Sequence, residues 1–181
     1  MELKPFFPSP VIQELRVSAD LRWFGHKLHL SFQMHDPKGR LLIPPQKPGS
    51  GLRSEGLWKH TCLECFLTSK FLKPAYFELN ISPSGDWAFY AFDSYRQGMR
   101  TVELQQAPRI VAGPLTTSWH IEVDLLGVKG IEGVPLLAAA SAVLELQSGE
   151  LTYWADAHHQ DKPDFHHPDH FVRDLAIEEK I

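Results

Sequence analysis

Two glutamates and an asparagine occupy alternate positions in two strand-like segments, a spacing that can build a polar binding site. Glu64 lies in the run 61–67, and Glu78 and Asn80 lie in the run 76–81. Successive side chains of a β-strand point to opposite faces, so Glu78 and Asn80 share one face. If the two runs pair as neighbouring strands, all three polar side chains can lie on one open face. Beside aromatic rings, such carboxylates and amides bind sugar hydroxyls.

The alternative is an ordinary solvated face. A half-exposed antiparallel sheet carries polar residues on its outer side without any binding function. Alternation alone therefore leaves both interpretations of Glu64, Glu78 and Asn80 open.

The elements that must position these residues follow from the same period of two. In the runs 27–35, 117–125 and 150–157, apolar and polar residues alternate. Turns such as Lys38-Gly39 and Ser84-Gly85 separate such runs. We predict strands at 11–17, 21–24, 27–35, 40–43, 61–68, 76–82, 86–93, 108–112, 117–125, 137–147, 150–157 and 170–175.

Many short strands separated by turns are typical of an all-β fold, and we expect a two-sheet antiparallel β-sandwich of the immunoglobulin or jelly-roll kind. The 181 residues contain no internal repeat and no linker, so residues 1–181 are expected to form a single domain. A net charge of −4 argues against nucleic-acid binding, and no apolar run is long enough for a membrane span. With two cysteines and no recognisable secretory signal, a cytoplasmic location is expected.

Several motifs resemble the bacterial DOMON-like proteins, which are grouped with the family-9 carbohydrate-binding modules. The motifs are Leu57-Trp58-x-x-Thr61-Cys62-x-Glu64-x-Phe66-Leu67, Tyr76-Phe77-Glu78-Leu79-Asn80-x-Ser82-Pro83-Ser84-Gly85-Asp86-Trp87, Tyr95-Arg96-x-Gly98-Met99-Arg100 and Leu151-x-Tyr153-Trp154-Ala155. The resemblance covers roughly residues 55–172. It implies a β-sandwich with a ligand face, in a superfamily whose members bind sugars or haem.

The resemblance also suggests roles for individual residues. Sugar-binding modules of this family hold a terminal sugar between two tryptophan rings, for which Trp58 and Trp154 are the candidates here. Glu64, Asn80 and Arg96 are the candidates for gripping its hydroxyl groups. A planar guanidinium can bind vicinal hydroxyls or an anion, although Arg96 could instead be held by an acidic neighbour such as Asp93 or Glu64.

Two other groups of residues carry possible chemistry. Cys62 and Cys65 stand three apart in one strand, so they point to opposite faces and are too far apart for a disulfide. The segment 156–170 holds five histidines, whose imidazoles could bind a metal. It has no standard zinc spacing, and its prolines favour an extended loop that packs Phe165 and Phe171 down and leaves its polar residues in water.

Catalysis and cofactors receive less support. The chain lacks the motifs of nucleophilic hydrolases and of nucleotide-binding loops. Glu64 and Glu78 could form a glycosidase pair, but an open sheet face seldom shifts carboxyl pKa values enough. Haem ligands such as Met34 and Met99 are available without an attachment motif. We therefore expect no enzyme, no cofactor and no bound metal.

The sequence thus predicts a non-catalytic domain that binds a small molecule, with carbohydrate first among the ligands. The predicted ligand-binding residues are Trp58, Glu64, Glu78, Asn80, Arg96 and Trp154. Two other functions stay open: a protein-interaction or structural domain without a pocket, and a haem- or metal-binding domain.

Overall fold

The computed structural model describes residues 1–46, 51–113 and 117–179, and it is built almost entirely of β-strands. The strands are β1 (Glu2–Pro5), β2 (Arg16–Trp23), β3 (Lys27–His35), β4 (Cys62–Thr68), β5 (Tyr76–Ile81), β6 (Trp87–Phe92), β7 (Arg100–Thr101), β8 (Arg109–Ala112), β9 (Ser118–Asp124), β10 (Leu136–Glu145), β11 (Leu151–Ala155) and β12 (Arg173–Leu175). Helix in these ranges is limited to the 3₁₀ turns η1 (Leu57–Lys59) and η2 (Pro168–His170). None of the described helical segments is long and apolar enough to cross a bilayer. The all-β prediction is confirmed.

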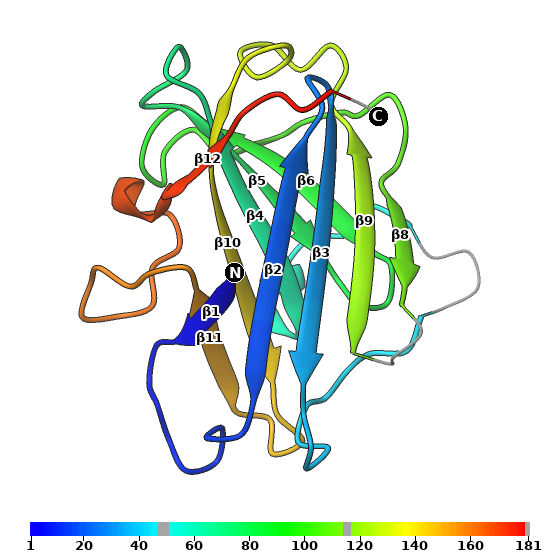
Figure 1. Cartoon of the computed structure of the whole chain (residues 1–181), viewed down its shortest axis with the longest axis vertical. Helices are drawn as coiled ribbons and strands as arrows, with labels where there is room; N and C mark the ends of the chain where they lie inside the picture. The colour runs from blue at the N-terminus through cyan, green and yellow to red at the C-terminus, as the bar shows by residue number, and fades with distance from the viewer. Residues whose placement is uncertain (47–50, 114–116, 180–181) are drawn as a thin grey trace.

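The strands form one continuous hydrogen-bonded path that curls back over itself. Its order is β7-β6-β5-β4-β10-β11-β1-β2-β3-β9-β8, with β12 attached to β10. Neighbouring strands on this path pair antiparallel, and β1 pairs with both β11 and β2. In Figure 1, β2, β3 and β9 pass in front of β4, β5 and β6. The expected separation into two sheets is therefore not confirmed, because β1 joins the two layers.

The main hydrophobic core fills the space between the two layers. Alternate residues of each strand contribute to it, such as Leu28 and Phe32 from β3 and Leu63 and Leu79 from β4 and β5. These side chains are almost completely buried. Removing so much apolar surface from water is the main force that holds a sheet of this kind closed.

The outer face of β4, β5 and β6 is also covered, contrary to the prediction of an open face. Every residue of these three strands is buried. A second hydrophobic cluster lies there, and Phe165 from the segment that follows β11 is part of it, with Phe171 packed against it. We call the segment 157–172 the roof. The histidine-rich loop thus packs down its phenylalanines as expected, but it also buries His170 and Asp164.

Strand positions agree with the predictions best where alternation is strong. The range 27–35 is reproduced by β3, and 61–68 differs from β4 by a single residue. The predicted strand 11–17 is strand only at its last two residues, because residues 11–14 form turns. From there β2 continues without a break through Ser18, Ala19 and Asp20 into the predicted strand 21–24. The predicted strand at 40–43 is only an isolated bridge from Leu41. β1 and β7 were not predicted, since both are very short.

Candidate functional site

A cavity of about 360 Å³ lies between the outer face of β4–β5 and the roof. It brings together four of the six predicted site residues, and the other lining residues come from the roof and neighbouring strands. The lining residues are Trp58, Glu64, Glu78, Phe92, Arg96, Met99, Val143, Tyr153, Pro163, Phe165 and His166. Charged groups therefore meet aromatic rings in one pocket that is open to solvent on one side.

Glu64 and Glu78 supply the two carboxyl groups of the cavity floor. Glu64 stands opposite Asn80 of β5 and Ser141 of β10, so Glu78 is its diagonal neighbour. Such neighbours on an antiparallel pair are about 7–8 Å apart, within reach of long side chains. The Ser141 hydroxyl donates to Glu64 Oε2 at 3.1 Å. Both glutamates are almost fully buried, at 3% and 5% exposure.

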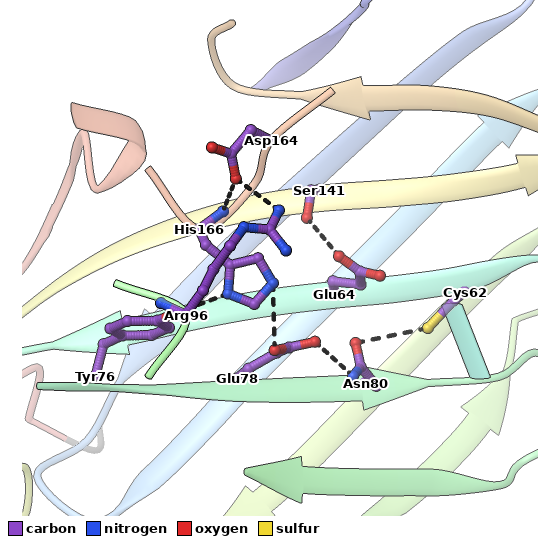
Figure 2. Close-up of polar contacts among 9 residues, drawn as sticks. All are labelled: Cys62, Glu64, Tyr76, Glu78, Asn80, Arg96, Ser141, Asp164 and His166. Carbon is purple, nitrogen blue, oxygen red and sulfur yellow. Dashed lines mark hydrogen bonds and ion pairs between the residues drawn. The ribbon is translucent and has the colours of Figure 1, made fainter. Parts of the chain in front are cut away.

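Asn80 lies behind the floor and does not line the cavity. It is completely buried, and its Nδ2 donates to Glu78 Oε1 at 2.7 Å. Its Oδ1 accepts a weak hydrogen bond from the Cys62 thiol. Figure 2 shows this row of contacts along β5. Asn80 shares a face with the glutamates as predicted, but its position suits the orientation of Glu78 and not contact with a ligand.

The two predicted tryptophans lie on opposite faces of the sheet and cannot form a clamp. Trp58, on η1, lines the cavity and is 38% exposed, with its ring against Tyr90. Trp154 is 2% exposed in the main core, where its indole donates to Thr152. The structure thus corrects the assignment of Trp154. Tyr153, its neighbour on β11, points the other way and lines the cavity.

Arg96 enters the cavity from the loop after β6. Its φ is 55°, in the left-handed region that side chains with a Cβ seldom adopt. Its guanidinium donates to Asp164 Oδ1 at 2.8 Å, and Tyr95 donates to the other oxygen at 2.6 Å. Figure 2 shows Arg96 between Asp164 and the two glutamates. The acidic partner of Arg96 is therefore in the roof, not Asp93 or Glu64.

A short hydrogen-bond chain fixes the imidazole of His166. The Arg96 backbone N–H donates to the Tyr76 hydroxyl at 3.2 Å, and this hydroxyl lies 2.8 Å from His166 Nδ1. When that hydroxyl donates to Nδ1, the ring proton is on Nε2. Nε2 lies 3.8 Å from Glu78 Oε2. In this tautomer His166 directs an N–H toward the cavity floor.

Burial strongly shifts the pKa values of Glu64, Glu78 and His166. Loss of water raises the pKa of Glu64 well above its usual value, and the neighbouring Glu78 raises it further. Burial also raises the pKa of Glu78 to about 7, although Asn80 and Arg96 act in the opposite direction. Burial, with Arg96 nearby, lowers the pKa of His166 to about 4. At neutral pH the imidazole is therefore uncharged, burial favours the protonated form of Glu64, and the Glu78 carboxyl is partly protonated.

Asp164 differs from the two glutamates. Burial acts to raise its pKa, but hydrogen bonds from Tyr95 and Arg96 lower the pKa overall. Asp164 is therefore an ionised partner of Arg96, and together they form an ion pair beside the cavity.

The structure offers donors and acceptors for hydroxyl groups beside flat apolar rings. Arg96 and His166 present N–H groups, and the two glutamates present oxygens. Trp58 and Tyr153 supply aromatic surface for C–H groups. Among the described residues, no group of three histidine, cysteine or acidic side chains is arranged to hold a metal ion.

Cys62 and Cys65 behave as predicted. Both are free and buried, Cys62 in the second cluster and Cys65 in the main core, so they point to opposite faces of β4.

Two other hollows among the described residues lack this combination. One lies over β2, β3, β8 and β9 and is lined by side chains such as Arg22, His29 and Glu122. These residues are at least partly exposed and pair with one another or with the C-terminal segment, as expected for a solvated face. A second lies beside the N-terminal segment and is largely apolar.

Sequence reasoning missed Tyr153, Phe165, His166 and Asp164 as parts of the site. A signal existed for Tyr153, because alternation places Tyr153 and Trp154 on opposite faces and only one can meet Trp58. The roof residues gave no comparable signal, since a loop without periodicity does not reveal which strand it covers.

The comparisons with known proteins identify a likeness in fold. No protein-family model matches the chain, and neither does any curated protein. A solved structure from Bacteroides uniformis, described as a "putative carbohydrate-binding protein", aligns with a TM-score of 0.55 at 14% identity, over 93% of this chain and 83% of that one. The likeness shows a shared fold.

Two further solved structures are family-9 carbohydrate-binding modules from Caldicellulosiruptor kristjanssonii. The one in complex with glucose aligns at 15% identity and a TM-score of 0.47, over 83% of this chain and 69% of that one. The one in complex with cellotriose aligns at 14% identity and a TM-score of 0.48, over 85% and 70%. At these TM-scores the two likenesses carry no weight for function.

Proposed function

We propose that this protein is a non-catalytic domain that binds a small carbohydrate in the cavity under the roof. The observation that carries the proposal is the meeting of Trp58, Glu64, Glu78 and Arg96 in one pocket. Aromatic rings cover the C–H faces of a sugar, while carboxyl and guanidinium groups bind its hydroxyls. The volume of about 360 Å³ suits one or two sugar rings better than a long chain.

The shared fold with the Bacteroides uniformis protein supports the carbohydrate assignment. A fold alone does not carry a function, so the weight rests on the cavity residues. As part of the same proposal, residues 1–181 are a single domain of the family-9 carbohydrate-binding-module-like superfamily, in the DOMON-like branch. The curled sheet is then a β-sandwich whose layers are joined through β1. The motifs around Trp58, Glu64 and Asn80 support that placement.

The proposal also includes a cytoplasmic location, for which two unpaired buried cysteines are suitable. In that compartment the ligand is a soluble mono- or disaccharide, or a related metabolite. Cell fractionation with an antibody against the chain tests the location directly.

Calorimetric titration with a panel of neutral mono- and disaccharides tests the function. A ligand present at about 100 times its Kd stabilises the folded state by about 2.7 kcal/mol, which a thermal-shift assay also detects. Saturable binding of at least one sugar supports the proposal. If no sugar in the panel binds or raises the melting temperature, carbohydrate binding is wrong for this cavity.

A further inference from the structure

We propose that the ligand of this cavity is an amino sugar, whose protonated amine sits against Glu64 and Glu78. This inference rests on the proposed function and names the class of sugar. It begins from the two buried carboxyl groups of the cavity floor, whose ionised forms the protein balances only in part.

The cavity lining and the residues hydrogen-bonded to it contain more acidic than basic side chains. Among the eleven lining residues, Arg96 is the only one with a permanent positive charge. That charge is already paired with Asp164, whose side chain is 1% exposed. Glu64 and Glu78 therefore share one nearby guanidinium, which is already hydrogen-bonded to the Asp164 carboxylate, and neither has a cation of its own in the lining. Each accepts a side-chain hydrogen bond from a neutral group, Glu64 from Ser141 and Glu78 from Asn80.

A buried carboxylate without a counter-charge is costly, and the cost falls when a cation binds beside it. The other side chains that face Glu64 and Glu78 do not supply a cation. Cys62 and Tyr76 are neutral at physiological pH because burial raises the pKa of each, that of Tyr76 to about 12. His166 is neutral because burial lowers its pKa. A ligand ammonium group would provide the missing positive charge.

The walls of the cavity favour the same ligand. Trp58, Phe92, Tyr153 and Phe165 line it with aromatic rings. The face of an aromatic ring attracts an ammonium group and also covers the apolar face of a sugar ring. An amino sugar presents both features in one small molecule, whereas a neutral sugar supplies no positive charge to favour ionisation of the two carboxyl groups.

The inference predicts a change in protonation on binding. Glu78 has a pKa of about 7, so a fraction of the molecules carry a proton there at neutral pH. An ammonium group that binds beside it stabilises the carboxylate and displaces that proton to the buffer, while the amine keeps its own proton. A neutral sugar has no such effect on the carboxylate.

The test compares four sugars of similar shape by calorimetry near pH 7. The probes are D-glucose, D-glucosamine, 6-amino-6-deoxy-D-glucose and N-acetyl-D-glucosamine. We expect an amine to bind roughly tenfold or more tightly than glucose, because a charge-assisted hydrogen bond exceeds a neutral one by about that factor. Acetylation removes the charge and should remove the advantage. Repeating the titration in phosphate and in Tris should reveal proton release for the amines alone.

Two isosteric variants and one control complete the test. In Glu78→Gln and in Glu64→Gln, the affinity ratio of amine to glucose should fall toward one. Glu122→Gln alters an exposed glutamate on the far layer and should keep the wild-type ratio. If one floor variant fails to fold, the other variant still tests whether a ligand amine binds the floor carboxyl groups. The buffer comparison on wild-type protein tests the same point independently.

The remaining outcomes distinguish failure of the amino-sugar inference from failure of carbohydrate binding itself. Equal affinity for glucose and for both amines overturns this inference and leaves carbohydrate binding standing. Binding of calcium chloride alone, abolished by the floor variants, overturns it in favour of a metal ion. If none of the four sugars binds, the amino-sugar inference fails together with the proposed function.

Discussion

The Arg96 guanidinium and the Asp164 carboxylate, 68 positions apart in the chain, are joined at 2.8 Å beside the cavity. Asp164 is buried in the roof, while the Arg96 side chain is about half exposed. The pair therefore ties the loop after β6 to the roof beside the carboxyl groups of Glu64 and Glu78.

Arg96→Ala should weaken the binding of any sugar at least about tenfold, and it should lower the free energy of unfolding by roughly 1–3 kcal/mol. The loss of stability follows because Asp164 then keeps a buried charge with fewer donors. Calorimetry and urea denaturation measure the two effects. Arg109→Ala, on the exposed strand β8, is the matched control. Unchanged sugar affinity in Arg96→Ala would remove Arg96 from the site.

Trp58→Ala should abolish the thermal shift caused by a bound sugar and leave the fold intact. The indole lies on a short 3₁₀ turn, is 38% exposed and contributes little to the core. Its loss removes an aromatic wall of the cavity. Phe71→Ala removes an aromatic ring that is 82% exposed and is not among the cavity residues, so it should keep the full shift. A normal shift in Trp58→Ala would contradict the proposed ligand position.

Glu78→Gln should change how stability depends on pH. The folded protein holds the Glu78 proton more tightly than the unfolded chain, since its pKa rises from 4.5 to about 7. The stability that this proton contributes is fully present below about pH 4.5 and is lost as pH rises through 7. Glu78→Gln should therefore gain stability relative to wild type across that range, by on the order of 3 kcal/mol.

Denaturation at a series of pH values measures this difference. His166, with its pKa lowered to about 4, is present in both proteins, so its effect largely cancels in the comparison. Glu122→Gln on the far layer serves as the control. Parallel pH profiles for wild type and Glu78→Gln would show that the Glu78 carboxyl is not a strongly perturbed acid.

Cys62 and Cys65 should resist thiol reagents in the folded protein. Their exposures are 0% and 1%, and burial raises the pKa of both thiols, so the reactive thiolate is scarce. We expect 5,5′-dithiobis(2-nitrobenzoate) to label both after denaturation and neither before it. Dithiothreitol should leave the melting temperature unchanged. A lower melting temperature with reductant would reveal a disulfide and refute the assignment of both as packing residues.

Arg173→Met should destabilise the fold by about 3–5 kcal/mol. Arg173 on β12 forms two hydrogen bonds to Asp156 at 2.8 Å and 2.6 Å, and both side chains are buried. Removal of the cation leaves Asp156 charged and buried beside β10. Urea denaturation measures the loss, and Arg22→Met, whose ion pair with Glu178 is exposed, should cost at most about 1 kcal/mol. Equal costs for the two variants would contradict this assignment.

The sequence predicted strand positions and side-chain faces best where apolar and polar residues alternate. The period of two located β3 and β4 closely and placed Glu64 and Glu78 on one face. The same rule, applied to β11, already separates Trp154 from Tyr153, but the resemblance to modules with paired tryptophans led to the wrong member of that pair.

Two features were beyond sequence reasoning for physical reasons. The joining of the two layers depends on β1, a four-residue strand that ends at Pro5 and has too few residues to show a pattern. The closing of the outer face depends on the roof, whose contacts to β4 and β5 are made by side chains distant in the chain. Such non-local packing leaves no local periodicity.

The floor and the roof of the cavity differ in how readily their residues can be substituted. Glu64 and Glu78 are locked into ladders that also carry the main core, so altering their backbone would disturb the whole sheet. Pro163, Phe165 and His166 belong to a connecting segment outside the named strands. Substitutions in that segment can reshape the pocket while the framework stays constant, which is a route by which related chains acquire different ligands.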